Sequence, residues 1–215
     1  MKFNTKTIHG GQENIDPAYK SVMAPIYQTT TYSQSSPGQH LGFEYSRSGN
    51  PTRTALQEAL ASIENATHGF AFGSGLAAID AVLKMLTPGD EVVATKNIYG
   101  GSYRLFENIY KGFGIQFHYV DLHKAEDLEQ YLNANTKLIW IETPTNPMMN
   151  IIDLKAISNL TQQHKILLAV DNTFATPYLQ QPLELGADIV MHSGTKYLGG
   201  HSDVVLGALV VRNDE

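Results

Sequence analysis

Residues 1–50 show no sustained period of apolar positions, whereas the rest of the chain does. Thr, Tyr, Gln, Ser and Gly dominate this first stretch, so we expect an extended arm that packs against something else. The pattern changes at Asn50, a good helix cap, followed by Pro51, which is tolerated at a first helical position. Apolar residues then recur at helical spacing, at Leu56, Leu60 and Ile63. The sequence therefore predicts a helix over about 51–65.

A second helix is predicted from Ser74–Gly75 to the turn at 87–90. Its apolar face consists of Leu76, Ile79, Leu83 and Leu86. Short apolar runs follow, several of them separated by helical patterns such as that over 152–164. These runs cover 91–95, 116–120, 138–141, 166–170, 189–191 and 204–211. Runs of this kind are typical of strands buried on both faces. We predict an α/β fold with a mainly parallel sheet between helices, divided into an arm (1–50) and one large domain (51–215).

Composition narrows the classes of function. The chain has 215 residues, 42% of them hydrophobic, which is enough for a sizeable core. With 15 basic and 21 acidic residues the net charge is −6, and no basic stripe suggests a nucleic-acid partner. The absence of cysteine excludes disulfides, a thiolate nucleophile and cysteine-based metal sites. Without a signal-peptide pattern or a membrane-length apolar run, we expect a cytoplasmic protein that has no membrane partner.

The segment from Phe72 to Ala78 fits the Gly-x-Gly-x-x-Ala pattern of dinucleotide-binding turns and precedes a helix. That interpretation needs an acidic residue about 20 positions on, where the sequence has Thr95, Lys96 and Asn97. A nicotinamide cofactor is therefore disfavoured. Two interpretations stay open: a backbone socket for a phosphate group at a helix start, or a tight turn that closes on its helix.

Two predicted strands are followed by side chains that could take part in a reaction. Asp171 follows one of them, and Ser193-Gly194-Thr195-Lys196 follows the next. An amine that condenses with a carbonyl, hydroxyls that hold a phosphate and a carboxylate that keeps a ring nitrogen protonated are the parts of a pyridoxal phosphate site. Individually, an acid at a strand end is usually a cap and a lysine is usually a solvated charge.

Other chemistries find less support. Ser74 and Ser193 lie outside any Gly-x-Ser-x-Gly elbow, which argues against serine hydrolysis. The histidines form no His-x-x-x-His pair on a helix, and His192 and His201 are more consistent with structural roles. We predict no metal site.

Six ordered blocks of sequence resemble the Cys/Met-metabolism family of pyridoxal phosphate-dependent enzymes, which includes cystathionine gamma-synthase and cystathionine gamma-lyase. The blocks are 45–53 (YSRSGNPTR), 74–76 (SGL), 99–101 (YGG), 142–147 (ETPTNP), 171–174 (DNTF) and 193–196 (SGTK) with 200–203 (GHSD). They run from the arm almost to the last residue. The resemblance implies the large domain of fold type I and pyridoxal 5'-phosphate as cofactor.

The resemblance also implies a role for individual residues. Lys196 would form the imine with the cofactor, and Asp171 would pair with its ring nitrogen. Phosphate donors would come from Gly75, Leu76, Ser193 and Thr195. Tyr99, a catalytic candidate, would stack on the ring, and Asn146 would lie by the ring oxygen and the substrate carboxylate. Without the resemblance, Tyr99 is interpreted as a core aromatic residue and Asn146 as a cap before Pro147.

Tyr45 and Arg47 would reach the phosphate of a neighbouring subunit, which implies a homo-oligomer, a homotetramer by resemblance, with shared sites. Two positions bear on the subfamily: methionine gamma-lyases carry cysteine where Gly101 stands, and sulfhydrylases tend to lack Arg104. Arg104 could bind a carboxylate at the far end of a substrate. The implied functions are therefore those of methionine biosynthesis and cysteine metabolism.

The expected reaction is gamma-replacement by cysteine on an activated homoserine ester, which gives cystathionine. Gamma-elimination of cystathionine to cysteine, 2-oxobutanoate and ammonia is the alternative. Family members are close to twice this length, and their smaller C-terminal domain, which supplies a carboxylate-binding arginine, is expected to be absent from this chain. A pyridoxal phosphate-binding fragment without catalysis is therefore a second hypothesis.

Overall fold

The computed structural model describes residues 1–12 and 16–212. The last three residues of the predicted large domain and three residues of the predicted arm lie outside the described part. The helices are α1 (Phe3–His9), α2 (Pro51–Ile63), α3 (Gly75–Leu83), α4 (Gly100–Asn108), α5 (Leu154–His164) and α6 (Thr176–Leu179), with short 3-10 segments η1 (Tyr110–Phe113), η2 (Ala125–Tyr131) and η3 (Pro182–Leu185). The strands are β1 (His68–Phe72), β2 (Glu91–Thr95), β3 (Gln116–Val120), β4 (Thr136–Glu142), β5 (Leu167–Asp171), β6 (Ile189–Ser193) and β7 (Gly207–Val211).

Helices α2 and α3 begin where their capping residues predict. Asn50 Oδ1 accepts a hydrogen bond from the Thr52 N–H at 2.9 Å, and Pro51 occupies the first helical position. Ser74 Oγ accepts one from the Ala77 N–H at 3.1 Å. These side chains satisfy N–H groups that have no partner inside the helix. The ends differ from the predicted ones by about a turn or less, because helix ends fray and lack such a clear signal.

The seven strands form one sheet in the order β1-β7-β6-β5-β4-β2-β3. Strands β2 to β6 pair in parallel, while β7 is antiparallel to both β6 and β1. The prediction of a mainly parallel sheet is confirmed. The sequence analysis missed β1, and it began the last strand too early, because β7 starts only at Gly207.

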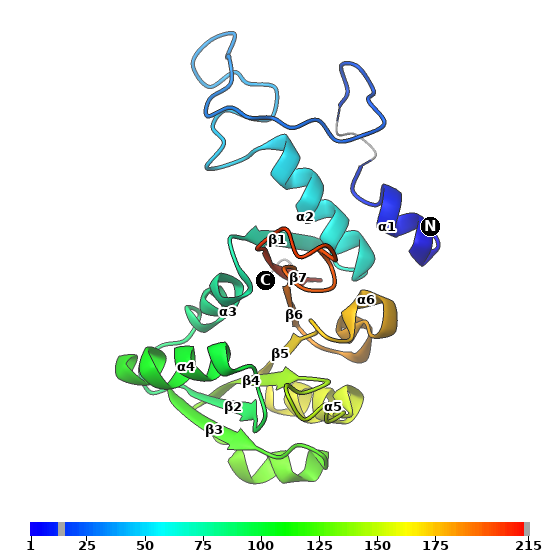
Figure 1. Cartoon of the computed structure of the whole chain (residues 1–215). Coiled ribbons are helices and arrows are strands. Elements are labelled where there is room, and N and C mark those ends of the chain that lie inside the picture. The colour runs from blue at the N-terminus through cyan, green and yellow to red at the C-terminus, as the bar shows by residue number, and fades with distance from the viewer. Residues whose placement is uncertain (13–15, 213–215) are drawn as a thin grey trace.

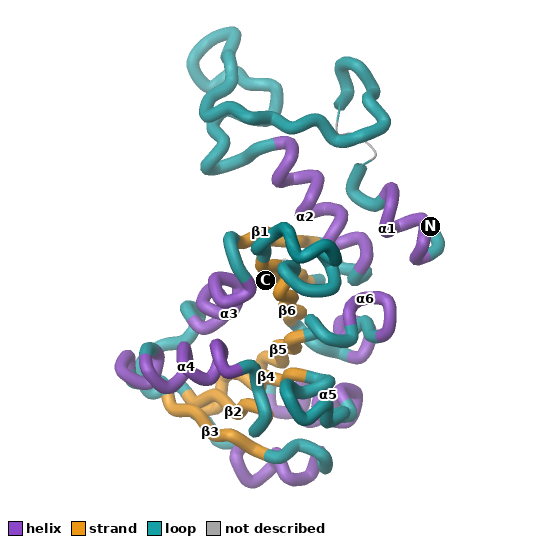
Figure 2. Tube along the Cα trace, in the orientation of Figure 1, coloured by secondary structure: helices purple, strands orange, loops and turns teal. Residues whose placement is uncertain are grey.

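Hydrophobic side chains are buried on both faces of the sheet. In β4, Ile139 and Ile141 join one core with Leu128 of η2 and Ile157 of α5. Trp140 points to the opposite face, where α3 and α4 contribute to a second core. Figures 1 and 2 show α3 and α4 on one side of the strands and α5 on the other. The predicted arrangement of a sheet between helices is confirmed.

In the N-terminal segment, residues 16–50 extend beyond the sheet at the start of α2, while α1 lies beside α2 (Figure 1). The sequence analysis did not predict helix α1, because none of its residues is buried and no apolar period marks it. The base of the segment is tied to α2: the Tyr27 N–H donates to Thr52 Oγ1, and Asn50 Nδ2 donates to the Tyr27 carbonyl, both at 2.9 Å. Among the described residues, no helix is long and apolar enough to cross a membrane.

Candidate active site

Parallel strands β4, β5 and β6 end at the same edge of the sheet, where a pocket of about 460 Å³ opens. Ligands in sheets of this type bind beyond the carboxyl ends of the strands. Eight of the residues singled out in the sequence line this pocket: Gly75, Leu76, Tyr99, Asn146, Asp171, Ser193, Thr195 and Lys196. They come from segments as far apart as 75 and 196, so the sheet topology brings them together.

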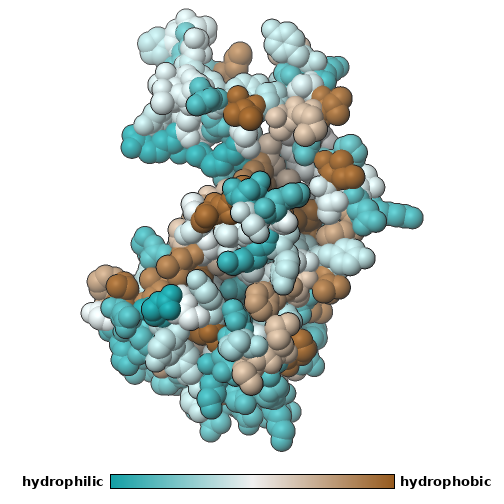
Figure 3. Space-filling view, viewed as in Figure 1, coloured by the Kyte–Doolittle hydropathy of each residue, from teal (hydrophilic) through white to brown (hydrophobic). Residues whose placement is uncertain are grey.

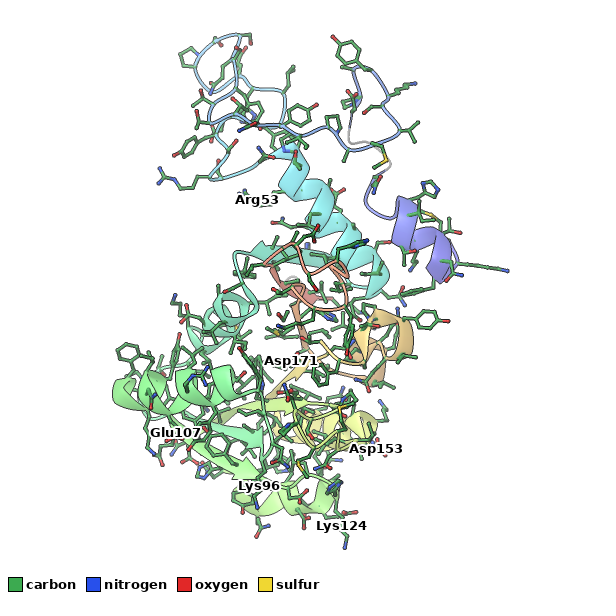
Figure 4. All side chains as sticks on the ribbon, viewed as in Figure 1. Arg53, Lys96, Glu107, Lys124, Asp153 and Asp171 are labelled. Atoms are coloured by element: carbon green, nitrogen blue, oxygen red, sulfur yellow. The ribbon has the colours of Figure 1, made fainter. Side chains whose placement is uncertain are left out.

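Asp171 is the last residue of β5 and is almost fully buried, near the centre of the molecule (Figure 4). Thr173 donates to Asp171 Oδ1 through its main-chain N–H at 3.0 Å and through its hydroxyl at 2.5 Å. Burial raises the pKa of Asp171, while the bonds from Thr173 and the charge of His192 act in the opposite direction. A cationic ring nitrogen is a group that this buried carboxyl would hold well.

The start of α3 suits an anionic group. The first N–H groups of a helix have no partner within it and attract phosphate. A Cβ at Gly75 would lie 2.9 Å from Ser193 Cβ and 3.1 Å from Met191 Cε, so glycine alone allows α3 to approach β6 this closely. The main-chain donors of α3 and the side chain of Ser193 therefore form one cradle. These residues fit a phosphate-bearing cofactor.

Thr195 and Lys196 lie in the turn that follows β6. The Thr195 hydroxyl accepts from the Leu206 N–H at 3.0 Å and donates to the Leu206 carbonyl at 3.2 Å, so it also holds the loop that returns to β7. The Lys196 side chain is exposed, and the Lys196 N–H donates to the Ser193 carbonyl at 3.1 Å. The amine is therefore accessible from the pocket that Asp171 also lines.

Tyr99 immediately precedes α4 and is 46% exposed, so it is not a core aromatic residue. Its ring lies against Gly101, where a Cβ would come within 2.2 Å of the ring. Asn146 lies half-buried in the turn that follows β4. Both side chains line the pocket from loops that leave the sheet edge.

Glu142, Thr173 and Phe174 are among the lining residues that sequence reasoning did not assign to the site. Glu142 accepts from the Tyr99 N–H at 2.6 Å. Burial and the neighbouring Asp171 carboxyl raise the pKa of Glu142 to about 8. A signal was present, because Glu142 ends a buried apolar run on an acid in the same way as Asp171 does.

Three of the candidate residues lie apart from the pocket wall. Tyr45 and Arg47 are exposed on the arm, with the Arg47 guanidinium 4.9 Å from the centroid of the Tyr45 ring. Arg104 is exposed on α4, and its Nη1 lies 3.5 Å from where a Cβ at Gly100 would be, so the side chain folds back toward the start of that helix.

Within residues 1–12 and 16–212, no three His, Asp or Glu side chains gather as a metal site requires.

The sheet, the glycine-opened helix start and an acid and a lysine that line one pocket match the large domain of fold type I pyridoxal phosphate-dependent enzymes. The chain belongs to the Cys/Met metabolism PLP-dependent enzyme family, whose model matches residues 4–215. The resemblance seen in the sequence is thereby confirmed.

Relatives with different activities are similar to this chain to nearly the same degree. Cystathionine beta-lyase of Lactococcus lactis subsp. cremoris is 51% identical over 98% of this chain and 55% of its own length. Cystathionine gamma-synthase/O-acetylhomoserine (thiol)-lyase of Bacillus subtilis is 48% identical over 93% of this chain and 53% of its own. The structure of cystathionine gamma-lyase from Lactobacillus plantarum, complexed with L-serine, superposes with a TM-score of 0.96 at 45% identity, over 99% of this chain and 55% of that one. The chain thus spans about half the length of the relatives it matches.

Proposed function

We propose that the pocket at the ends of β4, β5 and β6 binds pyridoxal 5'-phosphate and that the protein is an enzyme of transsulfuration. One observation carries this proposal: a buried carboxylate, an accessible lysine and a phosphate cradle line the same pocket. Titration of the protein with pyridoxal phosphate, followed by its visible absorbance, tests it. Failure of the complete protein to bind the cofactor would overturn it.

When bound, the cofactor supplies an aldehyde to an amine and a ring that stabilises negative charge at the substrate α-carbon. Asp171 would accept a hydrogen bond from the protonated ring nitrogen. Gly75, Leu76 and Ser193 would hold the phosphate at the start of α3. Lys196 Nζ would hold the cofactor and would move protons at the α and β carbons of the substrate. Tyr99 would cover the ring.

Among the activities of the family we propose that of cystathionine gamma-synthase, because the segment from Tyr99 to Phe106, with Arg104, resembles that branch. Arg104 folds back toward the start of α4, next to Tyr99, where its planar donor group suits a carboxylate at the far end of a substrate. The full-length protein, given an activated homoserine ester and cysteine, should form cystathionine.

Cystathionine gamma-lyase is the alternative, and relatives with beta-lyase activity are equally similar. Product analysis on cystathionine separates the three. Cysteine with 2-oxobutanoate and ammonia indicates the gamma-lyase, and homocysteine with pyruvate and ammonia indicates the beta-lyase. A protein that synthesises cystathionine but does not break it down supports the synthase.

A non-catalytic pyridoxal phosphate-binding chain is the remaining candidate, because residues 1–215 correspond to about half of the related enzymes. A preparation of this chain that binds the cofactor and turns over neither a homoserine ester nor cystathionine supports that candidate. Detectable turnover excludes it.

We further propose that sites are shared between subunits of a homo-oligomer. Tyr45 and Arg47 are not among the residues that line this chain's own pocket, and the described part of their segment, 1–12 and 16–50, buries almost no apolar side chain. A second copy of the chain would receive these two side chains at its own phosphate cradle.

A further inference from the structure

Glu142 occupies an unusual place for a carboxyl group. It is the last residue of β4, with 6% of its surface exposed, and the four residues before it in the strand, 138–141, are buried and apolar. It pairs in register with Asp171 on β5, and both side chains line the same pocket. Burying a second acid beside the first is costly unless the acid makes specific contacts.

The contacts of Glu142 are with main-chain donors of two separate loops. Its Oε2 lies 2.6 Å from the N–H of Tyr99, the residue that precedes α4. The main-chain N–H of Asn146, in the turn that follows β4, also acts on this carboxyl and lowers its pKa. No side chain caps the start of α4, so the Glu142 carboxyl supplies the acceptor for the N–H of the N-cap residue Tyr99.

We infer that Glu142 is a positioning residue, which clamps the loops of Tyr99 and Asn146 to the sheet edge and so fixes both side chains over the cofactor pocket. The main chain at Tyr99 is held by Glu142, and its ring is held by the close approach of Gly101. With both ends fixed, the ring has one place relative to Asp171. The clamp is a property of this chain, while its consequence for the cofactor rests on the proposed function.

The test uses Glu142→Gln, which keeps the size of the side chain but replaces one acceptor oxygen with a donor group. Hydrogen exchange of the main-chain amides is measured without cofactor, on peptides that contain Tyr99 and Asn146. Exchange should become about tenfold faster in these two segments, the effect of losing a hydrogen bond of about 1.4 kcal/mol. In the wild-type protein both amides should be protected, and exchange there at unprotected rates overturns the clamp even if the variant fails to fold.

Glu91→Gln is the matched control. Glu91 is also a buried carboxyl group on the sheet, but it lies at the start of β2, where it accepts from Asn133 Nδ2 at 3.0 Å and contacts His118 Nε2 at 2.8 Å. Its replacement should leave exchange at Tyr99 and Asn146 unchanged. Equal acceleration in both variants would mean a general loss of stability and would overturn the assignment of Glu142.

A spectroscopic measurement separates positioning from simple stabilisation. With pyridoxal phosphate bound, the visible circular dichroism of the cofactor should weaken in Glu142→Gln and stay at the wild-type level in Glu91→Gln. If the wild-type protein binds no cofactor while the exchange results hold, the clamp stands and the proposed function fails. If cofactor binds and Glu142→Gln changes neither exchange nor dichroism, the clamp fails and the proposed function stands.

Discussion

The hydroxyl of Thr173 joins two sides of the pocket. It donates to Asp171 Oδ1 and accepts from the Ser193 N–H at 2.8 Å, so it links the acid at the end of β5 to the end of β6. Asp171 is buried, and a buried carboxylate needs donors to remain charged and in place. Thr173 therefore sets the orientation of the group that we propose holds the ring nitrogen.

Replacing Thr173 with Val should weaken pyridoxal phosphate binding by about 10- to 100-fold, because a hydrogen bond to a charged group contributes about 1.5–3 kcal/mol. Titration by absorbance measures the change. Thr161→Val is the control, since Thr161 is a buried threonine on α5 whose hydroxyl donates to the Ser158 carbonyl at 3.1 Å, away from the pocket. An equal loss of affinity in both variants would contradict the link.

Lys196 is the proposed attachment point of the cofactor. Borohydride treatment of the cofactor-bound protein should fix the label to the peptide that contains Lys196 and remove the visible absorbance. Lys196→Ala should abolish labelling while the far-ultraviolet circular dichroism is unchanged. Peptide mapping that finds the label on Lys96 or Lys165, or spread over surface lysines, would show that the assignment is wrong.

Glu142 should make the cofactor-free protein less stable as the pH rises from about 5 to 8. Its pKa is raised from 4.5 to about 8, mainly by burial, so the folded chain keeps this proton at pH values where the unfolded chain has lost it. Its contribution to the free energy of unfolding is full below about pH 4.5 and falls as pH rises toward 8, with a slope of up to about 1.4 kcal/mol per pH unit.

Urea unfolding of the wild-type protein and Glu142→Gln at several pH values measures this contribution. The stability of the wild-type protein relative to the variant should decline between about pH 5 and pH 8, because glutamine cannot lose a proton. A difference that stays constant over this range would show that the Glu142 carboxyl is ionised throughout.

At the scale of elements, one buried carboxyl group connects the end of α2 to the strands that carry the pocket through two contacts. Glu64, at the end of α2, places Oε1 2.5 Å from His192 Nε2 and accepts from Asn172 Nδ2 at 2.9 Å. His192 lies on β6 between the pocket residues Met191 and Ser193, and Asn172 follows Asp171. All three contacting side chains are buried.

Glu64→Ala should therefore lower the free energy of unfolding by about 3–5 kcal/mol, the cost of leaving buried polar partners without their acceptor. Chemical denaturation measures it. Glu58→Ala on the exposed side of the same helix should change stability by less than about 0.5 kcal/mol. A small effect of Glu64→Ala would mean that water replaces the carboxyl group.

Sequence patterns predicted the elements that have their own local signal. The capped start at Asn50 gave α2, and runs buried on both faces gave the parallel strands. Strand β1 was missed because its residues His68–Phe72 are only partly buried and it pairs with β7, far away in the chain. Asp171 and Lys196 were singled out because they follow predicted strands, and Glu142 carried the same signal but was not singled out. The partners of Glu142 and Glu64 could not be predicted, because these contacts join distant segments.

At the scale of the whole molecule, the arm exposes apolar side chains that its own domain does not cover. Tyr19, Val22, Ile26 and Leu41 are each 85% exposed or more, and Figure 3 shows hydrophobic residues on the surface of this region. Exposed apolar groups gathered on one segment indicate a surface that another molecule covers. A second copy of the chain would bury them and would bring Tyr45 and Arg47 to its pocket.

The proposal that sites are shared makes a quantitative prediction for mixed subunits of the complete protein. Arg47→Ala should weaken cofactor retention while the sheet stays folded, and Lys196→Ala should be inactive. In a random mixture about half of the dimers contain one subunit of each kind, and one of their two sites combines an intact arm with an intact lysine. Unfolding and refolding the two variants together should thus restore up to about one quarter of the sites, measured as turnover. Refolding each variant alone is the control, and a mixture without recovered activity would show that the arm serves its own chain.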